Sequence, residues 1–232
     1  MPFDYSPAWI SIKTSILATA VTFLLGVAAA RFMRGERGKF KEFVNSVLLL
    51  PMVLPPTVVG LALLIVFGIQ SPIGRLLDNL GYTIVFSWSA TVIAACVVSF
   101  PIMYMTALGG FDQVDPDIED AARTLGASEW TVFKKITMPA AKSSLLAGMV
   151  LTFARSLGEF GATLMLAGNI PGKTETLPLA VYFSNEGGNS YYALIYAGII
   201  MAISLGTLYL LKMFSGKSGN SRRIVPESSD IY

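Results

Sequence analysis

Two charged residues, Arg155 and Glu159, fall inside an apolar run that covers residues 143–166. A charge at membrane depth is costly, so such residues are normally paired or face a water-filled cavity. On a helix, side chains four residues apart share a face, so this arginine and this carboxylate can neutralise each other. Two interpretations follow. The pair fixes the helix within a bundle, or it lines a path and opens and closes during a transport cycle.

Prolines mark a second candidate for a transport path. Pro51, Pro55 and Pro56 interrupt the apolar run 44–69. Each proline removes a backbone N–H and crowds the carbonyl four residues earlier, so we expect the helix to bend or break there. The break either fits the run into a helix bundle or exposes backbone groups to a central path, as discontinuous helices do in transporters. These prolines, with Arg155 and Glu159, are the candidate path residues.

The sequence offers little for covalent or metal chemistry. It contains no histidine, which removes the commonest general base and the commonest metal ligand. Its one cysteine, Cys96, lies inside an apolar run, and no GxxxxGK[ST] phosphate loop is present. The apolar runs also lack a pair of carboxylates that could act as acid and base. These absences argue against an intramembrane enzyme, and we expect neither a metal site nor a cofactor in this chain.

The longest polar stretch between apolar runs, residues 115–139, carries strong helix-capping signals. Asp115 is a favourable N-cap, and Pro116 follows at the first helical position, where its missing N–H costs nothing. Gly126 sits where a C′ glycine ends a helix. Between them, apolar residues at helical spacing form one narrow stripe, made of Ile118, Ala121, Ala122 and Leu125.

A second short helix is predicted in the same stretch. Ser128 is its N-cap, Trp130, Phe133 and Ile136 lie on one side of it, and Pro139 ends the unit. Two short capped helices between apolar runs indicate a docking device, and the small side chains of the first stripe let a partner approach closely. The alternative is a helical hairpin that only packs on the chain's own spans.

Composition places the chain in a membrane. Of its 232 residues, 53% are hydrophobic and 14% are charged, whereas about a quarter are charged in soluble domains. The mean hydropathy is +0.61. A helix needs about 20 apolar residues to cross the hydrocarbon layer. Five runs meet this length, namely residues 9–30, 44–69, 84–108, 143–166 and 192–213. We predict an all-α integral membrane domain over residues 1–214, with about five transmembrane helices, and a polar, mobile tail over residues 215–232.

Basic residues predict the orientation of these spans. The segments that follow the first, third and fifth runs contain thirteen lysines and arginines when Lys212 at the end of the fifth run is included, and the opposite side contains three when Lys13 near the start of the first run is included. Cytoplasmic segments carry the excess of positive charge, so the N-terminus is predicted outside, and the C-terminus and the stretch 115–139 in the cytoplasm. Because no basic segment precedes the first run, we expect a retained span rather than a cleaved signal peptide.

The outer side is predicted to consist of two loops, 70–82 and 168–191, because both are rich in glycine and proline. In the second loop, Lys173 is opposed by Glu175 and Glu186, so the loop is not a basic funnel for an anion. Capture of an anion would then depend on a separate protein that docks on this loop.

The stretch 115–139 resembles the EAA loop of ABC importer permeases, in which Glu-Ala-Ala, Gly and Ile-x-Leu-Pro recur at fixed spacing. The matching residues are Asp120, Ala121, Ala122, Gly126, Ile136, Met138 and Pro139. Aspartate for glutamate and methionine for leucine are conservative departures. The resemblance implies that the loop fits a groove on the ATP-hydrolysing subunit. The residues expected to make this contact are Ile118, Asp120, Ala121, Ala122, Leu125, Gly126 and Trp130.

Two further stretches are similar to the molybdate permease subunits of type I ABC importers. Residues 50–60 read LPMVLPPTVVG, and residues 153–182 include Arg-Ser-Leu-Gly-Glu-Phe-Gly and Ala-Gly-Asn-Ile. With the EAA-type loop, the resemblance covers residues 9–213. Sulfate permeases share much of this pattern, so a sulfate, thiosulfate or tungstate permease is the alternative. A secondary transporter is a more remote alternative, since it would not need docking helices.

The resemblance also implies partners. It predicts a homodimer of this chain in the cytoplasmic (inner) membrane, in contact with lipid. Two ATPase subunits would bind ATP and magnesium on the cytoplasmic side, and an external molybdate-binding protein would deliver the oxyanion. The chain itself would be a non-catalytic, pore-forming subunit without a cofactor of its own, and nucleic acid is not expected among its partners.

Overall fold

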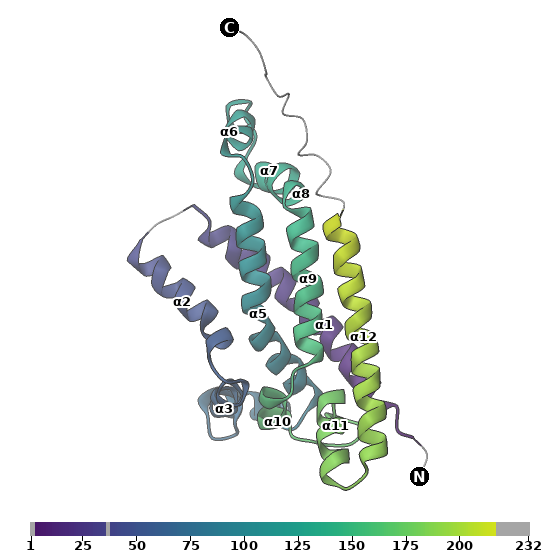
Figure 1. The fold of residues 1–232 in the computed structure, drawn as a ribbon. Coiled ribbons are helices and arrows are strands. Elements are labelled where there is room, and N and C mark those ends of the chain that lie inside the picture. Colours follow the sequence, from purple (N-terminus) through teal and green to yellow (C-terminus); the bar gives the residue numbers. More distant parts are fainter. Residues whose placement is uncertain (1–2, 36–37, 217–232) are drawn as a thin grey trace.

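The computed structural model describes residues 3–35 and 38–216, so most of the predicted tail, 215–232, lies outside the described residues. Within the described ranges every regular element is a helix, and the chain is an all-α protein. Three helices are long and apolar enough to cross a membrane: α1 (Ser6–Met33), α5 (Trp88–Asp112) and α12 (Ser190–Gly216). They form an elongated bundle with α9 (Lys142–Leu157), which lies between α5 and α12 (Figure 1).

The seam between α1 and α5 is built from small and hydroxyl-bearing side chains. Ala18, Thr22 and Thr91 are fully buried, and the hydroxyls of Thr14 and Thr91 lie 3.1 Å apart. Small residues let helix backbones approach closely in a membrane, where lipid tails offer no hydrophobic drive for association. The seam therefore joins α1 and α5 along their length.

The prolines of the second apolar run break it into two helices. α2 (Lys39–Val53) and α3 (Pro56–Phe67) meet at a 115° bend, so residues 44–69 do not form one continuous span. Leu54 is extended between them, and Pro56 starts α3, where its missing N–H is tolerated. Pro51 lies inside α2. The predicted bend or break is confirmed as a break.

The fourth apolar run is also broken, and the prediction of one continuous helix over residues 143–166 is wrong. α9 ends at Leu157, and a separate helix, α10 (Gly161–Ala167), follows after Gly158, Glu159 and Phe160. α10 packs closely on α3. A Cβ built on Gly60 would lie only 2.8 Å from the Ala162 Cα. The spacing of apolar residues in the run 143–166 does not predict this contact between α3 and α10.

Both predicted outer loops contain a helix, which corrects the expectation for residues 70–82 and 168–191. The first holds α4 (Pro72–Asn79), and the second holds α11 (Leu177–Glu186). Each begins with proline at its first or second position, so these prolines start helices rather than end them. α11 packs on α12 through Leu177 and Ala180, which are buried with Tyr196.

The polar stretch 115–139 forms four short helical segments. They are α6 (Pro116–Thr124), α7 (Glu129–Val132), the π-helix η1 (Phe133–Thr137) and α8 (Met138–Ala140), and α9 follows after a 71° bend. Figure 1 shows α6 beyond the end of the bundle, at the end opposite to the start of α1.

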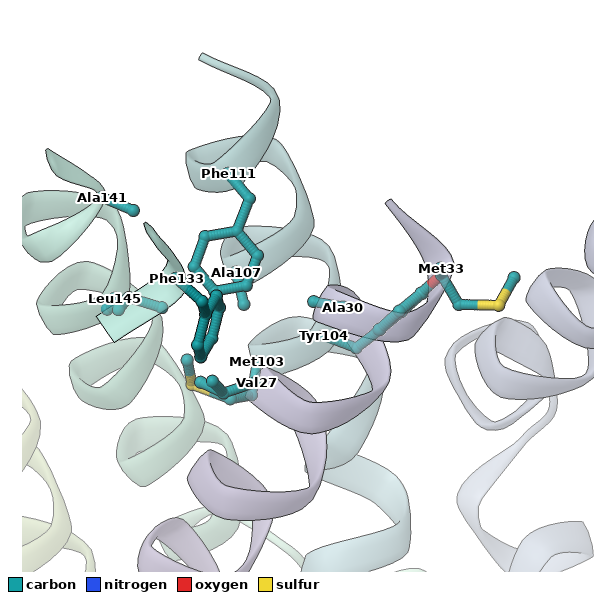
Figure 2. Close-up of a cluster of buried hydrophobic side chains, with 10 residues drawn as sticks. All are labelled: Val27, Ala30, Met33, Met103, Tyr104, Ala107, Phe111, Phe133, Ala141 and Leu145. Carbon is teal, nitrogen blue, oxygen red and sulfur yellow. The ribbon is translucent and has the colours of Figure 1, made fainter. Parts of the chain in front are cut away.

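A buried cluster ties this stretch to the bundle. Its members come from α1, α5, η1, α9 and the residue before α9, and are Val27, Ala30, Met33, Met103, Tyr104, Ala107, Phe111, Phe133, Ala141 and Leu145. Figure 2 shows Phe133 reaching in beside Phe111 and above Met103. The rings of Phe111 and Phe133 meet edge to face, with centroids 5.5 Å apart. η1 is thus held by apolar packing.

Candidate functional site

The caps of the polar stretch form as the sequence predicts. The Asp115 side chain accepts a hydrogen bond of 3.0 Å from the Asp117 N–H, and Pro116 is the first residue of α6. Gly126 follows α6 with φ +84°, a conformation that L side chains rarely adopt. Ser128 caps α7 by accepting from the Thr131 N–H. These local interactions fix where both docking helices begin and where the first one ends.

The predicted apolar stripe of α6 lies on the surface of the single chain. The exposed fraction is 55% for Ile118 and 88% for Leu125. Ala121 is exposed, whereas Ala122 is half-buried. On the following helix, Trp130 is 61% exposed. The chain's own packing therefore covers only part of Ala122 and leaves a large apolar side chain exposed at each end of the stripe.

The side of α6 that faces the bundle is held by the carboxylate of Glu119, whose partners lie far away in the sequence. Glu119 is 5% exposed and is the one buried residue of α6. Its Oε1 lies 2.6 Å from the Arg34 Nη1 at the end of α1 and accepts a 2.5 Å hydrogen bond from the Thr137 hydroxyl of η1. Arg34 is 85 residues away in sequence. Residue spacing therefore gave no signal for this pairing.

Arg123 joins α6 to α7. Its guanidinium lies 2.6 Å from the Asp120 Oδ1 and 2.7 Å from the Glu129 Oε1, and 3.8 Å from the Glu119 Oε2. The candidate docking residue Asp120 is thus already ion-paired within the chain. The Arg123 guanidinium also holds the pKa of the Glu129 carboxyl below its usual value. Arg123 thus contacts carboxylates on both short helices.

A cavity of about 460 Å³ lies where α1 and α5 meet α6, α7 and η1, and Arg34, Glu119 and Arg123 line it. Arg31, one turn before Arg34, lies over two aromatic rings, 4.2 Å from the Phe133 centroid and 4.9 Å from the Trp130 centroid. Both arginines at the end of α1 thus contact the docking helices, one through rings and one through a carboxylate.

The intramembrane pair forms, but not in the predicted arrangement. The Arg155 Nη1 lies 2.9 Å from the Glu159 Oε2, and Glu159 is 3% exposed. Glu159 lies beyond the end of α9, so the two residues do not share one helix face. Its Oε1 accepts a 2.8 Å hydrogen bond from the Ala162 N–H, which is among the first free donors of α10. Glu159 therefore closes the break as well as pairing with Arg155.

The two helix breaks lie side by side. A Cβ built on Gly161, next to the Glu159 break, would lie 3.3 Å from the Pro56 Cβ and 3.1 Å from the Thr57 Cγ2. The structure thus brings the Pro55–Pro56 break to the Glu159 break. It does not bring Pro51 there, because Pro51 borders a separate groove with Val47 and Cys96.

Solved structures define the class of this fold. The chain aligns with a chain of the inward-facing MetNI methionine ABC transporter with a TM-score of 0.70 and 14% identity, covering 90% of this chain and 94% of that one. It also aligns with a chain of a bacterial alginate ABC transporter with a TM-score of 0.70 and 13% identity, covering 92% and 80%. The fold is that of a type I ABC transporter transmembrane subunit.

Sequence comparison then gives the family. Residues 22–217 match the binding-protein-dependent transport system inner membrane component family, and the chain belongs to it. The molybdenum transport system permease protein ModB of Escherichia coli K12 is 43% identical over 212 residues, which is 88% of this chain and 91% of that protein. The sulfate transport system permease protein CysW of Synechococcus elongatus is 35% identical over 218 residues, or 93% and 75%.

Proposed function

We propose that this chain is the pore-forming permease subunit of an ATP-driven importer for a tetrahedral oxyanion, with molybdate as the cargo. The choice of cargo is supported by higher identity to a molybdenum permease, 43%, than to a sulfate permease, 35%, each over most of this chain. The family of inner membrane components of binding-protein-dependent systems supports delivery by an external binding protein.

The exposed stripe on α6 carries the coupling part of the proposal. Ile118, Leu125 and Trp130 are more than half exposed although all three are large and apolar. Burying one such side chain fully is worth about 1.5–3 kcal/mol, so a partner that covers all three gains substantial affinity. Ala121 lies between them and allows that partner a close approach. The partner is an ATPase subunit, which binds ATP and magnesium, while this chain performs no hydrolysis.

The proposed transport path runs between two copies of this chain. An apolar groove of about 780 Å³ lies between α11 and α12 and reaches the α9–α10 break at Gly158 and Phe160. Only 11% of the apolar window of α12 is buried within the chain. A second copy that covers this face would place the α2–α3 and α9–α10 breaks of both copies near the dimer axis. At the α9–α10 break, Glu159 already neutralises Arg155.

The orientation of the chain in the membrane follows from the proposed docking role of α6. α6 and the start of α1 lie at opposite ends of the molecule (Figure 1). With α6 on the cytoplasmic side, the start of α1 faces outward and the end of α12 faces the cytoplasm, as the basic residues predict. Topology reporters fused at Ser6 and Met213 should report opposite sides, with the Met213 fusion cytoplasmic. Reporters on the same side would contradict this arrangement.

Leu125→Glu tests the docking surface. A carboxylate forced into an apolar contact without a partner costs several kcal/mol, so the ATPase should no longer co-purify with the permease. Folding should be unaffected, because Leu125 is 88% exposed. Thr124→Glu is the matched control, since it adds the same charge to an exposed position of the same helix outside the stripe, and it should retain the ATPase. Normal co-purification with Leu125→Glu would refute the docking role.

The cargo is tested by uptake into proteoliposomes that contain the permease–ATPase complex and its binding protein. We expect ATP-dependent molybdate uptake that tungstate inhibits more strongly than sulfate, because tungstate matches molybdate in size and charge. Stronger inhibition by sulfate would assign the chain to sulfate transport. Uptake that continues without ATP while an ion gradient is held would point to a secondary transporter.

A further inference from the structure

α6 and η1 are attached to the rest of the chain in different ways. The other docking segment, η1, is held by the buried ring of Phe133, whereas the one buried residue of α6 is the carboxylate Glu119. The large apolar side chains of the stripe, Ile118 on α6 and Leu125 at its C-cap, are exposed. The first docking helix is therefore fastened through an ion pair and a hydrogen bond rather than through apolar packing.

The partner of Glu119 ends the first long helix. Arg34 is the C-cap residue of α1, and its Nη1 lies 2.6 Å from the Glu119 Oε1. The same guanidinium lies 3.9 Å from the Asp112 Oδ1 at the end of α5 and 3.5 Å from the Val114 carbonyl oxygen, which precedes α6. Arg34 thus contacts the end of α5, the connection to α6 and α6 itself.

The second partner of Glu119 is Thr137, at the end of η1, the segment that is held by apolar packing. Thr137 is the last residue of η1, is 2% exposed and donates its hydroxyl to the same Oε1 that Arg34 approaches. Arg123 approaches the other carboxylate oxygen at 3.8 Å. One buried carboxylate therefore links α6, α1 and η1, and the charged groups around it are Arg34, Arg123 and, beyond Arg34, Asp112.

We propose that Glu119 and Arg34 are positioning residues for ATPase coupling, which transfer movement of the docking helix α6 directly to α1. The inference rests on the proposed docking function. An apolar contact can slide by a turn at little cost, whereas a hydrogen-bonded ion pair holds one register. α1 packs along α5 through the bundle, so a displacement at Arg34 reaches the interior of the membrane through rigid, packed helices.

The pair does not need to be strong to act in this way. Replacing a buried ion pair by apolar residues of similar volume is often neutral for stability, while removing one partner leaves an uncompensated charge. The double variant Arg34→Met/Glu119→Leu should therefore fold and bind the ATPase through the intact stripe. Besides the link between α6 and α1, it removes the contact of Glu119 with Thr137 and that of Arg34 with Val114, but it keeps the apolar stripe, so it separates coupling from assembly.

The experiment uses the full complex in proteoliposomes with its binding protein. For Arg34→Met/Glu119→Leu we expect normal ATPase co-purification and continued ATP hydrolysis, with molybdate transported per ATP reduced by about tenfold, within the range of a typical coupling free energy. The binding protein should no longer stimulate hydrolysis. Lys39→Met, which removes an exposed charge at the start of α2, outside the proposed docking segments, should behave as wild type.

A distance measurement keeps the test informative if the double variant assembles poorly. Spin labels at Asp117 on α6 and Phe32 on α1, both exposed, can be introduced on a Cys96→Ala background. Their distance distribution should be narrow in the wild-type chain and broad in the double variant. A narrow distribution in both, or wild-type transport per ATP in the double variant, would overturn the inference. Loss of the docking role itself would appear separately, as normal ATPase co-purification with Leu125→Glu.

Discussion

Two buried carboxylates, each paired with an arginine, serve different parts of the molecule. Glu159 pairs with Arg155, four residues before it, and accepts a hydrogen bond from the Ala162 N–H three residues after it. Glu119 pairs with Arg34 across 85 residues and accepts from Thr137 across 18. The first carboxylate closes a break within one short segment. The second joins three elements that are far apart in the sequence.

The difference shows what each pair can transmit. Movement at Glu159 alters the junction of α9 and α10, which lies against the Pro56 break and so against the proposed path. Movement at Glu119 is passed to α1, at the end of the bundle where the ATPase is proposed to bind. The pair of Arg155 and Glu159, close in sequence, therefore shapes the break between α9 and α10. The pair of Arg34 and Glu119, distant in sequence, connects separate helices. Three changes break or sharpen this comparison.

Arg155→Met should have the largest effect, because it leaves the carboxylate of Glu159 buried without its cation. Removing one partner of a buried pair typically costs about 3–5 kcal/mol, so the melting temperature of the purified permease should fall markedly. Adding Glu159→Gln should restore it, since glutamine carries no charge and its carbonyl can still accept from the Ala162 N–H. We expect transport to recover as well.

The double variant also decides between the two roles of the pair. Recovered stability with recovered transport indicates that the pair fixes the break. Recovered stability with lost transport, or with ATP hydrolysis that is uncoupled from uptake, would assign the pair to the transport path. Glu159→Gln alone, with Arg155 left unpaired but 32% exposed in its side chain, should be milder than Arg155→Met alone.

Glycine substitutions in the two regions should have smaller effects than Arg155→Met, and the effects should differ between the regions. A Cβ at Gly60 would lie 2.7 Å from the Met165 Cβ and 2.8 Å from the Ala162 Cα, so Gly60→Ala must push α3 away from α10. Overpacking of this kind costs about 1–3 kcal/mol. A Cβ at Gly126 meets nothing within 4 Å, so Gly126→Ala costs only its backbone strain at φ +84°, about 1 kcal/mol.

Thermal unfolding of the two variants measures this difference. We expect Gly60→Ala to lower the melting temperature more, and Gly126→Ala to weaken ATPase co-purification more, because Gly126 sets the end of the docking helix. The reverse ranking in melting temperature would mean that the tight packing of α3 on α10 is not what holds the Glu159 break in place. The reverse ranking in co-purification would mean that the end of α6 at Gly126 does not shape the proposed docking surface.

The smallest expected effect is the pH dependence of the contact between α6 and α7. Arg123 holds the pKa of the exposed Glu129 carboxyl below its ordinary value of 4.5. A lowered folded-state pKa contributes stability that is present above the unfolded pKa and is lost as pH falls through the folded pKa. Trp130 fluorescence, in a Trp9→Phe/Trp88→Phe background, should be constant from neutral pH to about 4.5 and change below it.

Glu129→Gln provides the control for this measurement, since it removes the titrating group next to Trp130. The change below pH 4.5 should disappear in that variant. If the fluorescence still changes over the same range, protonation of Glu129 is not what alters the contact.

Local physical chemistry made much of the fold readable from the sequence. The caps at Asp115, Gly126 and Ser128 depend on groups within three residues of each other, so their residue types suffice to predict them. The break at Pro55 and Pro56 follows likewise from missing donors. The exposed stripe of α6 follows from helical spacing, although the spacing alone did not predict that Ala122 would be half-buried.

Other features needed the tertiary structure even though the residues involved are close in sequence. Pro72 and Pro178 were interpreted as loop residues, yet each starts a helix, because proline favours the first turn as much as it disfavours the interior. The run 143–166 has the length of a span, but α10 separates from α9 where it packs on Gly60 of α3. A helical period does not encode that contact.

The sequence by itself determined the class of the chain: an all-helical membrane protein with two short capped helices and a charged pair within an apolar run. The tertiary structure alone decided the pairing of charges that are distant in the sequence. Arg155 and Glu159 could be paired from their spacing, because residues four apart in the chain stay within reach of each other, although Glu159 lies beyond the end of α9. Arg34 and Glu119 could not, because only the packing of α1 against α5 brings the end of the first helix to the docking helix.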